Sequence, residues 1–171
     1  KVGVIPATGG QTKWFAIPGD PRNNYLARMD FIPHSHELMI QQLNREQNTD
    51  NLLIGDISNM TLSTILVEKD DAFLDIHDNI RWLDKDQFFT WTSERDGWLH
   101  LYKVSRDGKK IQVITKGDFD VVKINCIDPR SGYVYYIASP DNFTQRYLYR
   151  SRLDGRGKAE RITPLNNPGQ D

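Results

Sequence analysis

The chain has 171 residues, of which 38 % are hydrophobic, 26 % charged and 11 % aromatic, a mixture too apolar for a disordered protein. Its 22 Lys and Arg residues nearly balance its 23 Asp and Glu residues, and no run of Lys and Arg exceeds two, which argues against nucleic-acid binding. No apolar stretch approaches the roughly 20 residues of a membrane-spanning helix. The single cysteine, Cys126, excludes an intrachain disulfide and a Cys-based zinc site.

Short runs with an apolar residue at every second position dominate the sequence and predict β-strands. In chain order the clearest runs are 2–5, 38–40, 87–91 and 133–137. Asp-Gly pairs, which favour hairpin turns, separate several such runs. The pairs lie at 96–97, 107–108 and 154–155. The strongest helix candidate, 43–51, is polar on all sides, so we expect a long hairpin loop there and an all-β chain.

A strand–turn–strand unit is repeated along the chain. Its copies are LYKVSRDGKKIQVIT at 101–115, LYRSRLDGRGKAERIT at 148–163, and looser versions at 2–16 and 52–66. A second unit of two strands precedes three of these copies, at 27–43, 79–93 and 123–139. The copies start 47 to 50 residues apart, and four strands in such a period are typical of a β-propeller blade.

We therefore predict an all-β fold, a partial β-propeller of about three and a half four-stranded antiparallel blades. Residues 1–19 would form the outer half of one blade, and whole blades would follow at 24–70, 71–119 and 120–165. The alternative is an immunoglobulin-like sandwich, which also has short strands and frequent turns. A sandwich needs no fixed period with matching segments, so the repeat favours the propeller.

The residues show no catalytic, cofactor-binding or metal site, so none is predicted. An α/β-hydrolase needs Gly-x-Ser-x-Gly on a strand-to-helix turn, and the sequence lacks both this pattern and the phosphate-binding glycine loops. His34-Ser35-His36 offers two imidazoles but no third ligand, so we expect exposed loop residues there. Asp84-Lys85-Asp86 resembles the start of a calcium loop but lacks its glycine and distal glutamate, which favours a turn.

The most distinctive segment is WTSERDGWLHLY at 91–102. It predicts a strand, a tight polar turn and a second strand, with large apolar side chains on both strands. The turn residues Glu94, Arg95 and Asp96 are candidate ligand-binding groups, but we favour a charged network that closes the turn at the narrow inner end of a blade. The predicted structural blade motif comprises Trp91, Ser93, Glu94, Arg95, Asp96, Gly97, Trp98, Leu101 and Tyr102.

The same segment resembles the blade motif of the dipeptidyl peptidase IV family within the prolyl oligopeptidase superfamily, especially its bacterial members. Segment 78–83 is similar to the strand that precedes this motif in the family. Segment 114–121 is similar to the family's T-K-G-x-W-x-V pattern, with Phe119 where Trp is usual. Further similarities lie at 1–4, 133–139 and 148–149, so the resemblance covers the whole chain.

The resemblance implies an eight-bladed N-terminal propeller followed by an α/β-hydrolase domain, which removes dipeptides from peptide N-termini, often after proline. This chain would belong to the later half of that propeller and need no cofactor. The family's paired glutamates and its catalytic Ser, Asp and His would lie outside the chain. An Arg that some relatives place near the substrate aligns roughly at Leu74-Asp75 and is not matched.

We therefore predict a non-catalytic portion of a bacterial serine-type dipeptidyl peptidase that shapes substrate access. Its partners would be the hydrolase domain of the parent chain and peptide substrates, and the resemblance suggests the periplasm or the cell surface. The alternative is a non-catalytic propeller that acts as a scaffold or binding module for protein partners. The residues after Asp171 would discriminate between the two.

Both ends of the sequence look cut, so we expect an excised piece of a longer protein. Cutting a propeller would expose the apolar faces of its first and last blades, which favours association. We expect the fragment to self-associate, face to face or by donating strands from 1–19. The residues expected on the exposed faces are Phe31, Ile40, Ile124, Tyr135 and Ile137.

Overall fold

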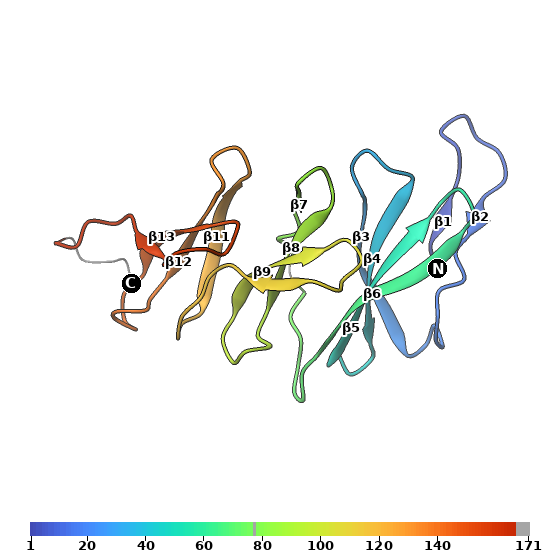
Figure 1. Cartoon of the computed structure of the whole chain (residues 1–171). Helices are drawn as coiled ribbons and strands as arrows, with labels where there is room; N and C mark the ends of the chain where they lie inside the picture. Colours follow the sequence, from blue (N-terminus) through green and yellow to red (C-terminus); the bar gives the residue numbers. More distant parts are fainter. Residues whose placement is uncertain (77, 167–171) are drawn as a thin grey trace. The chain divides into compact units, whose positions relative to one another are not determined.

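The computed structural model describes residues 1–76 and 78–166. Within these residues every regular element is a β-strand, and the fourteen strands pair antiparallel in one two-stranded and three four-stranded sheets (Figure 1). The prediction of an all-β chain is confirmed. The described part of the chain contains no helix long and apolar enough to cross a membrane.

The first compact unit, Lys1–Ile76, contains two sheets. The two-stranded sheet pairs β1 (Gly3–Val4) with β2 (Lys13–Trp14). The four-stranded sheet consists of β3 (Asn24–Phe31), β4 (Glu37–Asn44), β5 (Thr49–Asp56) and β6 (Thr61–Lys69), paired in chain order. Four consecutive antiparallel strands are the arrangement of a propeller blade.

The second compact unit, described from residue 78 to residue 166, contains two more four-stranded sheets of the same kind. One consists of β7 (Trp82–Leu83), β8 (Phe88–Ser93), β9 (His100–Ser105) and β10 (Ile111–Val113). The other consists of β11 (Val121–Asp128), β12 (Tyr133–Ala138), β13 (Tyr147–Arg152) and β14 (Glu160–Arg161).

The connection between β4 and β5 differs from the expectation of a long loop over 43–51. Strand β4 continues to Asn44 and β5 begins at Thr49, so only a short turn separates them. The side-chain oxygen of Asn44 accepts hydrogen bonds from the backbone N–H groups of Asn48 and Thr49, at 3.0 and 3.1 Å. An asparagine that bonds the backbone ahead of it closes a turn without a long loop.

The core of the first unit lies between the four-stranded sheet and the segment that contains β1 and β2. We call the sheet surface in this contact the hairpin face. Its buried residues Leu38, Ile40 and Leu53 pack against Val2 and Phe15. The backbone N–H of Phe15 donates to the carbonyl of Val2 at 3.0 Å, which holds the two buried residues together.

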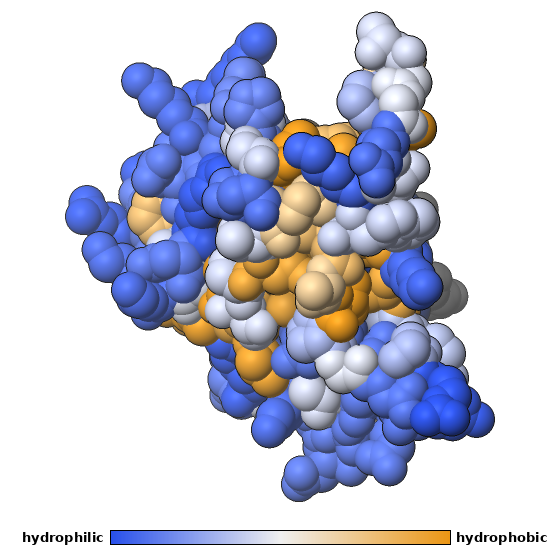
Figure 2. All heavy atoms as spheres, turned by 90° about the vertical axis from the view of Figure 1, so that its right-hand side faces the viewer, coloured by the Kyte–Doolittle hydropathy of each residue, from blue (hydrophilic) through white to orange (hydrophobic). Residues whose placement is uncertain are grey.

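The β3 edge of the hairpin face is open to solvent. Met29 and Phe31 lie directly opposite Ile40 and Leu38 on β4, and therefore share the hairpin face with them. Met29 is 64 % exposed and Phe31 57 %, whereas Ile40 is completely buried. Figure 2 views the side of the molecule that carries β1 and β2, and apolar atoms gather at its centre within a hydrophilic rim.

The predicted set of exposed apolar residues is thus only partly right. Phe31 is exposed, but Ile40 is covered by the segment of β1 and β2, because it lies one strand further from the sheet edge. Ile124, Tyr135 and Ile137 are half-buried rather than exposed.

The core of the second unit joins its two sheets. Leu101 and Ile114 belong to the same buried cluster as Val134, Tyr136 and Tyr149. Four rings run through this cluster. His100 meets Phe119 edge-on at 5.6 Å between ring centroids, Phe119 stacks on Tyr136 at 6.3 Å, and Tyr136 stacks on Tyr149 at 6.1 Å.

Candidate functional site

The predicted blade motif forms the hairpin of β8 and β9. Ser93 lies opposite His100 and Trp91 opposite Tyr102 in the register of the two strands. The turn is closed by a hydrogen bond of 2.8 Å from the N–H of Gly97 to the carbonyl of Glu94. Gly97 has φ of +96°, a conformation that a residue with a Cβ atom rarely adopts.

The apolar residues of the motif anchor this hairpin. Trp91, Leu101 and Tyr102 are buried, and Trp98 in the turn is half-buried. Complete burial of a large apolar side chain contributes about 1.5–3 kcal/mol each, so these residues fix the strands on which the turn is mounted.

His100 connects the hairpin to the loop after β10. Its side chain is 1 % exposed, and its Nε2 lies 2.9 Å from the carbonyl oxygen of Gly117. Thr115 Oγ1 accepts a hydrogen bond from the N–H of Leu101 at 2.9 Å and lies 3.2 Å from His100 Nδ1. A neutral imidazole with its proton on Nε2 satisfies all these contacts, with the Thr115 hydroxyl donating to Nδ1.

A second pair of contacts fastens the same loop to the turn. The N–H of Leu99 donates to Asp120 Oδ1 at 2.7 Å, and the N–H of Val121 donates to the Leu99 carbonyl at 2.8 Å. The β8–β9 turn is therefore latched to 115–121. The sequence pattern did not reveal the roles of His100 and Thr115, because His100 lies 15 residues from Thr115 and 17 residues from Gly117 along the chain.

The charged residues of the turn do not converge on one point. Arg95 Nε donates to Ser93 Oγ at 2.9 Å, and its guanidinium lies 5.1 Å from the centre of the Tyr102 ring. Asp96 Oδ2 is 3.9 Å from His100 Nε2. Glu94 is exposed to solvent. The structure thus gathers Arg95 with Ser93 and Tyr102, and directs Asp96 toward the latch.

Ser93 and His100 face each other across the strands but do not form a nucleophile–base pair. The two ring nitrogens of His100 are in contact with the Gly117 carbonyl and the Thr115 hydroxyl. A histidine that is to act as a base must direct one ring nitrogen at the serine hydroxyl. The hairpin geometry therefore does not supply the machinery to activate Ser93.

The other residues considered as ligands lie in turns. His34 and His36 are exposed between β3 and β4, and His34 has φ of +54°. Asp84, Lys85 and Asp86 form the β7–β8 turn with φ of 51°, 55° and 63°, and Asp84 pairs with Lys103. In residues 1–76 and 78–166, no three or more His, Cys, Asp and Glu side chains are grouped to hold a metal ion.

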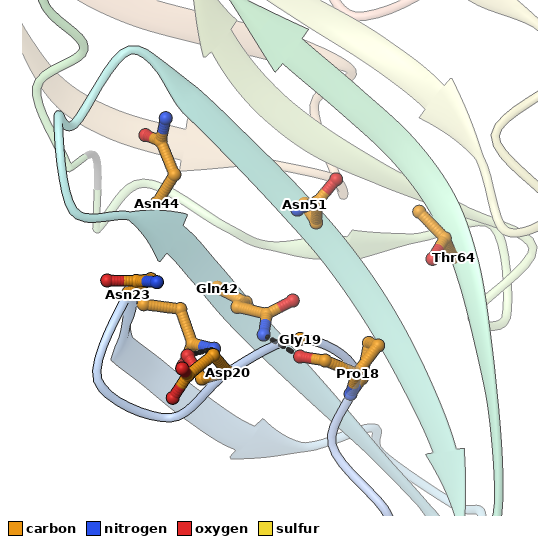
Figure 3. Close-up of a pocket in the computed structure, with 9 residues that line it drawn as sticks. Pro18, Gly19, Asp20, Asn23, Gln42, Asn44, Asn51 and Thr64 are labelled. Carbon is orange, nitrogen blue, oxygen red and sulfur yellow. Dashed lines mark hydrogen bonds between the residues drawn. The ribbon is translucent and has the colours of Figure 1, made fainter.

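The first unit contains a cleft of about 420 Å³ that sequence reasoning did not identify. Its walls are the connection from β2 to β3 and the hairpin face. Gln42 on β4, Asn51 on β5 and Thr64 on β6 line one side of the cleft, and Pro18 and Asp20 line the other (Figure 3). Gln42 and Asn51 lie directly opposite each other across the strands. We call this site the amide-lined cleft.

The rim of the amide-lined cleft is held by internal hydrogen bonds. Gln42 Nε2 donates to the Pro18 carbonyl at 2.7 Å, and Asn24 Nδ2 donates to the Asp20 carbonyl at 2.9 Å. The Asp20 carboxylate is bound by Arg22 at 2.8 Å, which lowers the pKa of Asp20. The cleft therefore has a fixed shape and one acidic group whose charge is already compensated.

A buried acid pair lies on the opposite face of the same sheet. Asp50 on β5 is directly opposite Glu68 on β6, and both are buried. Burial and the neighbouring Glu68 carboxylate raise the pKa of Asp50 to about 6. No hydrogen-bond donor among the described residues reaches Asp50 Oδ1. The alternation of the strand did not predict this burial, because an aspartate is usually exposed.

Comparison with known proteins gives a consistent result. A family model described as the dipeptidyl peptidase IV (DPP IV) N-terminal region matches residues 1–170. A probable dipeptidyl peptidase 4 of Aspergillus flavus is 30 % identical over 114 residues, which is 62 % of this chain and 15 % of that protein. A dipeptidyl peptidase 4 of Arthroderma otae is 27 % identical over 148 residues, which is 83 % of this chain and 18 % of that protein.

A solved structure agrees in fold. The crystal structure of Porphyromonas gingivalis dipeptidyl peptidase 4 superposes with a TM-score of 0.79 and 26 % sequence identity. The match covers 94 % of this chain and 22 % of that chain. The prediction of a partial propeller is confirmed. The chain spans about a fifth of the length of the relatives that it matches.

Proposed function

Because the chain belongs to the family of dipeptidyl peptidase IV N-terminal regions, we propose that it is a non-catalytic part of the propeller of a serine-type dipeptidyl peptidase. In that role it shapes the path by which peptides reach a hydrolase domain on the same polypeptide. The hydrolase removes N-terminal dipeptides, with Xaa-Pro as the expected sequence.

One observation supports a structural role above all others. The hairpin that carries the most distinctive motif is latched through His100 to Thr115 and Gly117, and its histidine is engaged in holding the loop rather than in activating a hydroxyl. Rigid sheets joined by such contacts make a good wall for a substrate path, since a fixed wall discriminates by size and shape.

A chimera tests this proposal. Residues 1–166 of this chain replace the matching 22 % of the P. gingivalis dipeptidyl peptidase 4, and the chimera is assayed with Gly-Pro p-nitroanilide and with a folded protein that begins with Ala-Pro. We expect cleavage of the small substrate and none of the folded protein. The isolated chain should hydrolyse neither substrate and should not be labelled by a fluorophosphonate.

Two results would contradict the proposal. One is a chimera that is labelled by the fluorophosphonate but also processes the folded protein as fast as the small substrate. The other is serine labelling of the isolated chain that survives further purification.

We further propose that the isolated chain self-associates through the open β3 edge of the hairpin face. Met29 and Phe31 present exposed apolar side chains there, and β3 has a hydrogen-bonded neighbour on one side only. An apolar surface beside an unpaired strand edge favours contact with a second copy, and the net charge of −1 offers little repulsion.

A further inference from the structure

The amide-lined cleft presents polar groups that the protein itself does not use. The side chains of Asn51 and Thr64 form no hydrogen bond within the described residues, and neither does Oε1 of Gln42. Gln42 is only 4 % exposed, and its Nε2 is held by the Pro18 carbonyl (Figure 3). Its oxygen is therefore held in place without an internal partner. An acceptor that is held in place and makes no bond within the protein favours a ligand that donates to it.

The lining excludes several ligand classes. It contains no Lys, Arg or His, so it offers no positive charge to a phosphate or a carboxylate. Its single acid, Asp20, is neutralised by Arg22, so it does not select a cation. It contains no aromatic ring on which a sugar could stack. What remains is an uncharged ligand that both donates and accepts hydrogen bonds.

A peptide group matches this lining. The amide of Asn51 places a donor beside an acceptor, as a peptide bond does, and Gln42, directly opposite on the neighbouring strand, adds its acceptor Oε1. The hydroxyl of Thr64 adds a third group on the next strand and can donate or accept. The cleft volume of about 420 Å³ lies in the range of small-ligand sites, so a short peptide segment fits.

We propose that the amide-lined cleft binds the main chain of an extended, uncharged peptide segment through Gln42, Asn51 and Thr64. The side chains of that segment contribute little, since the lining offers no charge and no aromatic pocket. The inference rests on the proposed function in one respect: in a dipeptidyl peptidase, peptides would be present at this part of the protein.

Saturation-transfer NMR with the whole chain tests the site, because the method tolerates self-association of the protein. The probe is N-acetyl-Ala-Gly-Ala-amide, and maltotriose is the comparison ligand that represents sugars. We expect saturable transfer to the peptide at millimolar concentration and none to maltotriose. Transfer to maltotriose alone would overturn the proposal. Absence of any transfer to the peptide, even at about 20 mM peptide, would overturn it as well.

Two variants locate the binding. Asn51→Leu and Thr64→Val each remove an unbonded polar group from the cleft. Asn51→Leu should weaken peptide binding at least tenfold, and Thr64→Val should weaken it severalfold. Asn125→Leu, an exposed asparagine on β11 outside the cleft, is the matched control and should bind as the original chain does. Circular dichroism confirms that each variant folds. Equal binding by the folded Asn51→Leu and Asn125→Leu variants refutes the site, whatever the chimera of the proposed function shows.

Discussion

The ring of Phe15 comes within 2.9 Å of the point that a Cβ atom on Gly55 would occupy. Leu62, on the neighbouring strand β6, lies 3.0 Å from the same point. Gly55 stands inside strand β5, where glycine is otherwise unfavourable. The absence of a side chain there lets Phe15 approach the sheet, so this glycine is a packing requirement rather than a turn residue.

Gly55→Ala should therefore destabilise the chain by about 1–3 kcal/mol, because the new methyl group overfills the contact with Phe15. Urea unfolding followed by tryptophan fluorescence measures the loss. In the double variant with Phe15→Leu the two changes should offset each other in part, since the smaller side chain leaves room for the methyl group. Strict additivity of the two single effects would show that the contact does not limit packing.

Loss of the latch should loosen the β8–β9 turn. His100→Leu leaves the Gly117 carbonyl and the Thr115 hydroxyl without their partner, which costs about 1–3 kcal/mol. Hydrogen exchange should become faster at the N–H groups of Leu99 and Leu101, which bond to the latched loop. The exposed His36 provides the control, and His36→Leu should change neither stability nor exchange at these two residues.

Stability should depend on pH through Asp50. Its pKa of about 6 in the folded chain exceeds the ordinary value of about 3.9 expected after unfolding. Between about pH 4 and pH 6 the folded chain then binds more protons than the unfolded chain, so stability falls as the pH rises through this window. Asp50→Asn should remove this fall and be more stable than the original chain at pH 7.5 by about 2–3 kcal/mol.

Urea titrations at half-unit steps from pH 4 to pH 7.5 measure the effect. Asp154→Asn is the matched control, because the bound Arg152 lowers the pKa of Asp154. The stability that this carboxylate contributes is therefore lost only in solutions more acidic than this range. The Asp154→Asn substitution should change the free energy of unfolding by the same amount at every pH from 5 to 7.5. Parallel curves for the original chain and Asp50→Asn would show that Asp50 is ionised in the folded state without cost.

Self-association should depend on the open β3 edge. Light scattering over a hundredfold dilution should give a mass above 19.8 kDa at high concentration. Met29→Gln and Phe31→Gln together should weaken the association at least tenfold, because they remove the apolar surface next to the strand edge. Phe143→Gln alters a more exposed ring in a loop of the second unit and should leave the association unchanged. A mass of 19.8 kDa at every concentration would exclude self-association.

The sequence predicts what is local in this fold. Alternating apolar residues and Asp-Gly pairs locate the hairpins, since both signals depend on neighbouring residues. The length of the β4–β5 turn was missed, because it depends on the hydrogen bonds of one side chain, Asn44. The candidate site was largely missed for a similar reason. The neighbours of His100 and the pairing of Gln42 with Asn51 depend on strand register and loop closure, which the residue pattern does not specify.

The row of four rings in the second unit has a thermodynamic consequence. His100 and Tyr149 stand at its ends, on β9 and β13, and Phe119 and Tyr136 join them. Neither sheet can lose its order without exposing rings that the other sheet covers, so the two should melt as a single cooperative unit. The asymmetric packing of the rings gives a near-ultraviolet circular dichroism signal, and its disappearance should coincide with the loss of strand structure.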